Sequence, residues 1–163
     1  MSMELYVFSD RKLASIEEWQ SALDAEGFDL RIYKDRSIEQ LSGFLPATIN
    51  GEVSGFECDH MDAASLIEEL ESEDYVIEHR WQYLLTFRFG GNRFECMAAC
   101  IAAAIYMKAV DGVLFDGEEG EFYGPDSALP YARRAADTSN WAEIDRILAE
   151  MALKYGTLPP GSE

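Results

Sequence analysis

The chain has 163 residues, of which 48% are hydrophobic and 12% aromatic; this composition suits one folded domain and excludes a disordered chain. Its 31 Asp and Glu residues against 13 Lys and Arg residues give a formal net charge of -18. Because so acidic a surface repels nucleic acid and anionic lipid, we exclude both as partners and consider a basic protein partner, or solubility alone.

The sequence also limits the cellular compartment. No uncharged run approaches the ~20 apolar residues that span a bilayer, and the first residues lack the pattern of a secretory signal. Three cysteines without regular spacing argue against a disulfide framework and favour a reducing compartment. We therefore expect a cytoplasmic protein.

The first 43 residues alternate between short strands and helices. Residues 5–8 predict a strand, and the Ser15–Glu18 capping box starts a helix that Gly27 ends. Alternating apolar residues predict a half-buried strand over 28–32. A second capping box, Ser37–Gln40, fits one further turn of helix.

A hairpin is predicted over residues 44–58. Asn50 and Gly51 separate two strand-like segments, and both turn positions require positive φ. Pro46 has no N–H to donate, so we expect its strand to lie at a sheet edge or to begin there. Asp62 then caps a short helix that carries Leu66, Ile67 and Leu70.

The alternation of apolar and polar residues is clearest over 75–89, which predicts a strand with one buried and one wetter face. Since ~15 residues exceed the usual strand length, we expect a break near His79 to Trp81. The following stretch, 93–110, is rich in alanine, has Asn92 as its cap and carries no charge between Cys96 and Met107. It predicts a buried helix.

After this helix, residues 113–115 and 122–123 predict short strands on either side of an acidic turn, and Asp126 starts a short helix that tolerates Pro130 only in its first turn. Asn140 caps the last helix. Its apolar positions step by three and four along one stripe, which predicts docking on the core: Trp141, Ile144, Leu148, Met151 and Tyr155.

Together these elements predict an α+β fold in a single domain over residues 1–156, followed by a flexible tail over 157–163. We expect a mostly antiparallel sheet of five or six strands. The central buried helix, about 93–110, packs across it, and the C-terminal helix packs against the same core.

Cysteine and histidine residues are candidates for a reactive centre. Cys58 and His60 lie two apart and Cys96 and Cys100 four apart, a set that suits zinc in residue type. Cys96, near a helix N-terminus, with His79 from the preceding strand would suit thiol catalysis. The apolar surroundings of these cysteines favour a structural role instead, so we predict no metal and no cofactor.

The acidic segment that follows the buried helix is the leading candidate site. Its acidic residues Asp111 to Asp126 occur without any Lys or Arg, but their order does not match a calcium-binding loop. Two aromatic residues follow the carboxylates directly, as in interfaces anchored by aromatics within a polar rim. The predicted partner-binding residues are Asp116, Glu118, Glu119, Glu121, Phe122 and Tyr123.

Two stretches carry a resemblance to a known group of proteins. The hairpin sequence 44–57 and the alanine-rich helix that runs into Asp111–Gly120 resemble small bacterial immunity proteins of polymorphic or contact-dependent toxin systems. The likeness covers residues 44–123. It implies a cytoplasmic, non-enzymatic inhibitor that binds one toxin tightly.

The leading hypothesis is therefore an acidic, non-enzymatic protein that neutralises a basic protein partner, a cognate toxin, by covering its cationic substrate surface. One alternative is an enzyme with a centre at Cys96 and His79 or at Cys58 and His60. Another is a housekeeping domain that self-associates through an apolar sheet edge, for example as a homodimer.

Overall fold

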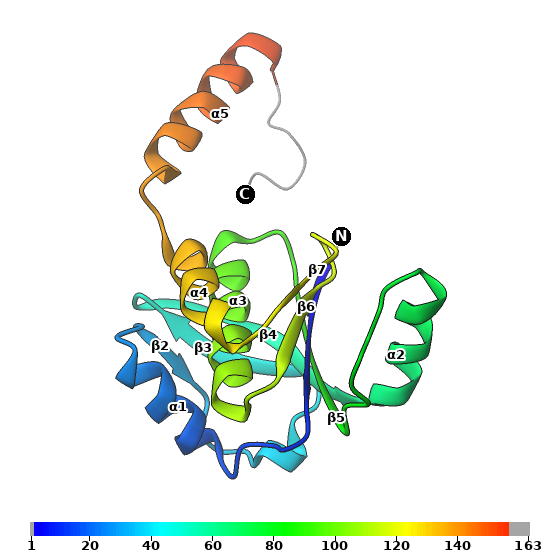
Figure 1. Cartoon of the computed structure of the whole chain (residues 1–163). Coiled ribbons are helices and arrows are strands. Elements are labelled where there is room, and N and C mark those ends of the chain that lie inside the picture. Colours follow the sequence, from blue (N-terminus) through cyan, green and yellow to red (C-terminus); the bar gives the residue numbers. More distant parts are fainter. Residues whose placement is uncertain (1, 157–163) are drawn as a thin grey trace.

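The computed structural model describes residues 2–156, and the α+β fold is confirmed (Figure 1). Seven strands, one or two more than expected, form a sheet in the order β2-β3-β4-β5-β1-β6-β7, and every neighbouring pair is antiparallel. The strands are β1 (Met3–Ser9), β2 (Leu30–Ile32), β3 (Phe44–Ile49), β4 (Glu52–Met61), β5 (Tyr83–Phe89), β6 (Val113–Asp116) and β7 (Glu121–Tyr123).

Helices cover the two faces of this sheet unequally. The helices are α1 (Ile16–Ala25), α2 (Ala63–Ser72), α3 (Arg93–Val110), α4 (Ala128–Ala136) and α5 (Trp141–Tyr155), with short 3-10 turns η1 (Ile38–Gln40) and η2 (Pro125–Ser127). Helix α3 packs across the sheet between α1 and α4, whereas α2 lies on the opposite face (Figure 1).

Helix α3 forms the centre of the main core, as the sequence predicts. The Asn92 side chain accepts hydrogen bonds from the backbone N–H groups of Phe94 and Glu95, and Asp111 ends the helix in a left-handed conformation. Because its buried alanines are small, α1 approaches closely enough for Trp19 Nε1 to donate to the Ala102 carbonyl at 3.1 Å. No helix among residues 2–156 is long and apolar enough to cross a membrane.

The predicted hairpin is present, but one expectation about it is wrong. Asn50 and Gly51 have φ values of 51° and 81°, as the two-residue turn requires. Strand β3 lies inside the sheet between β2 and β4, and it begins two residues before Pro46. The proline lies where pairing with β2 ends: its carbonyl still accepts from the Tyr33 N–H at 3.0 Å, and no strand residue of β2 lies opposite it to need an N–H donor.

The predicted strand over 75–89 is only half present. Residues Tyr83–Phe89 form β5, whose Leu85 and Phe87 face the main core. Residues 75–82 pair with no strand within the described range, since β1 ends at Ser9 and β4 ends at Met61, just before α2. The alternation in this segment instead places Ile77 and Trp81 against the second core, under α2.

The prediction that the C-terminal helix α5 docks on the core along its whole apolar stripe is wrong. Its contacts with the rest of the described chain lie in its first two turns: the Trp141 ring lies 5.4 Å from that of Phe94 and under the Arg93 guanidinium, and Asp145 pairs with Arg93 at 2.8 Å. Ile144 and Tyr155 are 44% and 65% exposed. The position expected for this helix, against α3, is occupied by α4, and α5 projects away from the sheet (Figure 1). The predicted tail over 157–163 lies outside the described residues.

A second, smaller core fills the space between α2 and the opposite face of the sheet. It contains Ile67 and Leu70 from α2 together with Phe8, Leu84 and Phe115 from three strands. Asp62 caps α2 by accepting from the Ser65 N–H at 3.1 Å. Since α2 covers only one end of this face, the rest of the face stays open beside it.

Candidate functional site

Asp116, the first predicted binding carboxylate, does not project into solvent. It is 7% exposed, and its Oδ1 accepts from the N–H groups of Glu118 at 2.9 Å and Glu119 at 3.1 Å. Its Oδ2 accepts from the Tyr131 hydroxyl at 2.7 Å. Burial, the nearby Cys100 thiol and this bond raise the pKa of Tyr131. Asp116 therefore shapes the turn and ties it to α4, and it is not accessible to a partner.

The other three predicted carboxylates lie on the surface. Glu118, Glu119 and Glu121 are all exposed. Glu119 accepts from the Tyr123 hydroxyl at 2.7 Å, a bond that raises the pKa of Tyr123. The carboxylates of Glu118 and Glu121 have no hydrogen-bond or ion-pair partner among residues 2–156, so their charge is available to a cationic ligand.

Phe122 and Tyr123 are half-buried and pack inside the molecule. The Phe122 ring lies 4.7 Å from that of Phe115, and the Tyr123 ring lies 4.8 Å from that of Tyr131. The Arg134 guanidinium sits 5.9 Å from the Tyr123 ring. These two aromatics hold β7 in place, and only their exposed edges are free to touch another molecule.

A second acidic segment meets the predicted one in space. The Tyr75 ring, just after α2, packs edge-on against Phe115 at 5.2 Å and Phe122 at 5.9 Å. Between Asp59 and His79 the chain has no Lys or Arg and carries eight carboxylates. They are Asp59, Asp62, Glu68, Glu69, Glu71, Glu73, Asp74 and Glu78. The lack of Lys and Arg between Asp59 and His79 is the sequence signal that could have identified this second acidic segment.

We call the exposed residues at this junction the acidic surface: Glu73 and Asp74 after α2, and Glu118, Glu119 and Glu121 in the turn. Val76, beside Tyr75, is 83% exposed and gives this surface an apolar side chain. The nearest cation of the α2 region, Arg80, is held by Glu71 through two hydrogen bonds, which lower the pKa of Glu71.

The proposed thiol centre at Cys96 and His79 is not assembled. His79 pairs with Asp10 and packs on Trp81, before the start of β5. Cys96 lies beyond the other end of β5, and seven residues of strand span about 23 Å. The hydrogen bond with Cys100 lowers the pKa of the Cys96 thiol, while the same bond and burial raise that of Cys100.

Cys58 and His60 also lack the geometry of a reactive pair. Cys58 is fully buried in the main core, and burial raises the pKa of its thiol well above the usual value. His60 Nε2 is bound to the Ile38 carbonyl oxygen at 2.7 Å. Within residues 2–156 no three His, Cys, Asp or Glu residues are grouped so that they would hold a metal ion, so the zinc set is not gathered.

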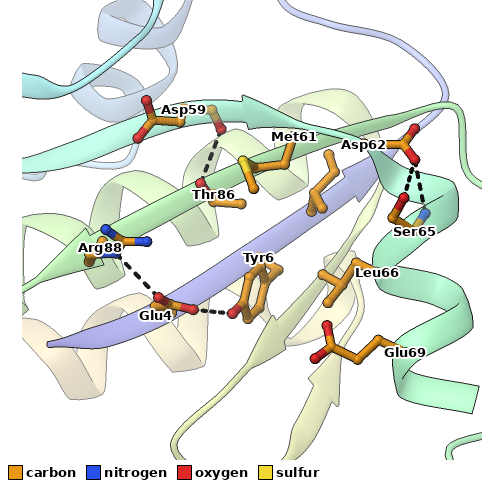
Figure 2. A pocket seen from close by; sticks show the side chains of 11 residues that line it. Glu4, Tyr6, Asp59, Met61, Asp62, Ser65, Leu66, Glu69, Thr86 and Arg88 are labelled. Carbon is orange, nitrogen blue, oxygen red and sulfur yellow. Dashed lines mark hydrogen bonds and ion pairs between the residues drawn. The ribbon is translucent and has the colours of Figure 1, made fainter. Parts of the chain in front are cut away.

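A groove that the sequence reading missed lies between α2 and the open face of β1, β4 and β5 (Figure 2). Its volume is about 370 Å³. Both acidic and apolar side chains line it, and the Arg88 side chain lies at one end (Figure 2). The lining residues are Glu4, Tyr6, Asp59, Met61, Asp62, Ser65, Leu66, Glu69, Leu84, Thr86 and Arg88.

Helix α2 forms one wall of the groove, and the segment that directly follows it carries Glu73 and Asp74 of the acidic surface, so the two regions adjoin at this helix. Carboxylates gathered on a surface attract cationic groups of another molecule. Comparisons of the chain with protein-family models, curated proteins and solved structures gave no match.

Proposed function

We propose that this protein is a non-enzymatic binding protein that neutralises a basic protein partner. The partner we propose is a bacterial toxin domain, and the chain acts as its immunity-type inhibitor. The observation that carries this proposal is the acidic surface, where carboxylates from two distant segments lie together around Tyr75 and Phe122. A toxin that acts on nucleic acid or another anionic substrate uses Lys and Arg side chains, and this surface is complementary to them.

The charge pattern supports a binding role over simple solubility. Elsewhere on the surface, several carboxylates have a cation beside them: Asp24 has Arg31, Glu26 has Lys108, Asp145 has Arg93 and Glu150 has Arg146. Glu118 and Glu121 have no such neighbour among residues 2–156. The negative charge of these two residues is therefore not offset by an ion pair.

Charge and apolar contact have different roles in the proposed complex. Opposed charges raise the association rate constant from about 10⁵–10⁶ to as much as about 10⁸–10⁹ M⁻¹s⁻¹ at low salt. Slow release requires desolvated apolar contact, which Val76 and the edges of Phe122 and Tyr123 are placed to supply. The three cysteines are free thiols, which fits the cytoplasm that we propose as the compartment.

Co-expression with the product of the neighbouring reading frame tests this function, because an inhibitor of this kind is normally made beside its target. We expect that product to be basic and to arrest growth, and we expect the present chain to restore growth. The triple variant Glu118→Lys, Glu119→Lys, Glu121→Lys should fail to restore growth, while Cys96→Ala should restore it fully. A neighbour that is harmless, or rescue that depends on Cys96, contradicts the proposal.

A further inference from the structure

The groove beside α2 is negatively charged although it contains an arginine. Arg88 Nε lies 3.2 Å from Glu4, and Arg88 Nη1 lies 3.9 Å from Glu57, so its charge is neutralised from two sides. Asp59 and Glu69 then remain with no ion-pair partner among residues 2–156. The groove therefore attracts a further cation from outside.

Besides Glu4, three acidic side chains line the groove, and they differ in their hydrogen-bond partners. Asp59 accepts from the Gly43 N–H at 2.8 Å, and Asp62 caps α2. Glu69 has no hydrogen-bond partner in the part of the chain that the structure describes, and it extends from α2 toward Tyr6 (Figure 2). Burial, the hydrogen bond to Glu4 and the charge of Glu69 together raise the pKa of Tyr6. Glu69 is thus the carboxylate that is free to bind.

The remaining walls of the groove are apolar. Leu66 from α2 lies on one side and Met61 from β4 on the other (Figure 2), and Leu84 from β5 also lines the groove. Met61 is 58% exposed. These side chains, with the Tyr6 ring, suit the aliphatic stem of a long cationic side chain, which buries its methylene groups while its charge pairs with a carboxylate.

We propose that this groove binds an arginine side chain from the surface of the basic partner, with the stem between Leu66 and Met61 and the guanidinium at Glu69 and the Tyr6 ring. A volume of about 370 Å³ is at the small end of the range for ligand pockets, so it suits one inserted side chain better than a large substrate. Arginine fits better than lysine because its planar guanidinium both stacks on an aromatic ring and pairs bidentately with a carboxylate.

This inference rests on the proposed function and adds the position at which the partner is anchored. Arginine is among the residues that most often dominate binding energy when inserted into a largely desolvated pocket. The groove and the exposed turn 118–121 are neighbours, since the Gly117 N–H donates to the Glu4 carbonyl at 3.1 Å, but none of residues 118–121 lines the groove, so each region can be altered separately by substitution.

Titration of the full-length ¹⁵N-labelled protein with N-acetyl-arginine methylamide, followed by NMR, tests the groove directly. The citrulline analogue has the same shape without the positive charge, and the lysine analogue has the positive charge without the planar guanidinium group. We expect the arginine probe to shift amide signals of groove residues such as Tyr6, Met61 and Thr86, with a dissociation constant on the order of millimolar. The citrulline probe should bind at least about tenfold more weakly.

Glu69→Gln and Glu68→Gln form a matched pair of variants, because both residues are exposed neighbours on α2 and only Glu69 lines the groove. Glu69→Gln should weaken the arginine probe by about threefold to tenfold, and Glu68→Gln by less than about twofold. The inference is overturned if the two variants behave alike, if citrulline binds as well as arginine, or if the shifts fall on Glu118–Glu121 and not on the groove residues.

Binding of the basic partner separates failure of this inference from failure of the proposed function. If Glu69→Gln leaves the partner's affinity unchanged while neutralising Glu118, Glu119 and Glu121 lowers it, the arginine site is wrong and the proposed function stands. If neither change affects the affinity, the proposed function fails as well.

Discussion

The ring of Tyr75, which follows α2, lies 5.9 Å from the ring of Phe122 in β7, with 73° between the two planes. This edge-to-face contact joins two segments that are about fifty residues apart in the chain. Because Glu73 and Asp74 precede one ring and Glu121 precedes the other, the contact brings their carboxylates to one end of the sheet. The acidic surface depends on it.

Removing the Tyr75 ring should destabilise the fold. We expect Tyr75→Ala to lower the free energy of unfolding by about 2 kcal/mol, since the half-buried ring touches both Phe115 and Phe122. Tyr155→Ala is the control, because that ring is 65% exposed and should cost less than about 0.5 kcal/mol. Urea unfolding measures both values, and equal losses would show that the contact is unimportant.

Asp116 should matter for stability rather than for binding. Asp116→Ala leaves two backbone N–H groups and the Tyr131 hydroxyl without their acceptor, so we expect a loss of about 2–4 kcal/mol. Glu118→Ala, in the same turn but exposed, should change the stability by no more than about 0.5 kcal/mol. Thermal unfolding of the two variants decides: a stable Asp116→Ala protein would contradict the role given to this carboxylate.

Alkaline pH should destabilise the protein partly through Tyr106. Burial raises the pKa of Tyr106 to about 12, from about 10 in the unfolded chain. The folded state holds the phenolic proton more tightly, so its contribution is complete below about pH 10 and is lost as the pH rises through about 12. The two-unit difference corresponds to about 2–3 kcal/mol.

Tyr106→Phe should therefore show a smaller fall in unfolding free energy than the wild type above about pH 10. Urea unfolding across this pH range measures the difference. Tyr33→Phe, on a ring that is 44% exposed, is the control and should follow the wild type. Parallel pH profiles for Tyr106→Phe and the wild type would be evidence against this linkage.

The three thiols should react at very different rates. Cys96 is half-buried with a lowered pKa, whereas Cys58 and Cys100 are buried with raised pKa values. With iodoacetamide at neutral pH we expect Cys96 to be labelled at least about tenfold faster than the other two, as read by mass spectrometry. Early labelling of Cys58 would mean that the main core opens readily.

Local sequence signals predicted much of the fold. Helix starts and tight turns depend on a few neighbouring residues, and these are found where the sequence patterns place them. They are the helix caps Ser15, Asp62 and Asn92 and the hairpin turn at Asn50. The alanine-rich stretch also predicted α3 to the residue, because a segment that is apolar on all sides has few alternatives to a buried helix.

The errors concern contacts between distant segments. The alternation over 75–82 is real, but none of the strands that the structure describes pairs with this segment. The stripe on α5 fits a core face that α4 already covers. In the sequence, Asp116 cannot be told apart from the other acidic residues of its turn. It becomes a buried hydrogen-bond acceptor because Tyr131 on α4 lies beside it in the fold. The groove likewise needs α2 and three strands to be placed together.

The most direct test of the acidic surface is the association rate constant with the basic partner, measured by stopped flow at low and high salt. The triple variant Glu118→Gln, Glu119→Gln, Glu121→Gln should associate at least about tenfold more slowly at low salt and depend less on salt. The control triple, Glu17→Gln, Glu39→Gln, Glu52→Gln, removes the same charge from exposed residues elsewhere and should stay within about twofold of the wild type. Equal slowing by both triples would mean that net charge alone acts, and would contradict a localised binding surface.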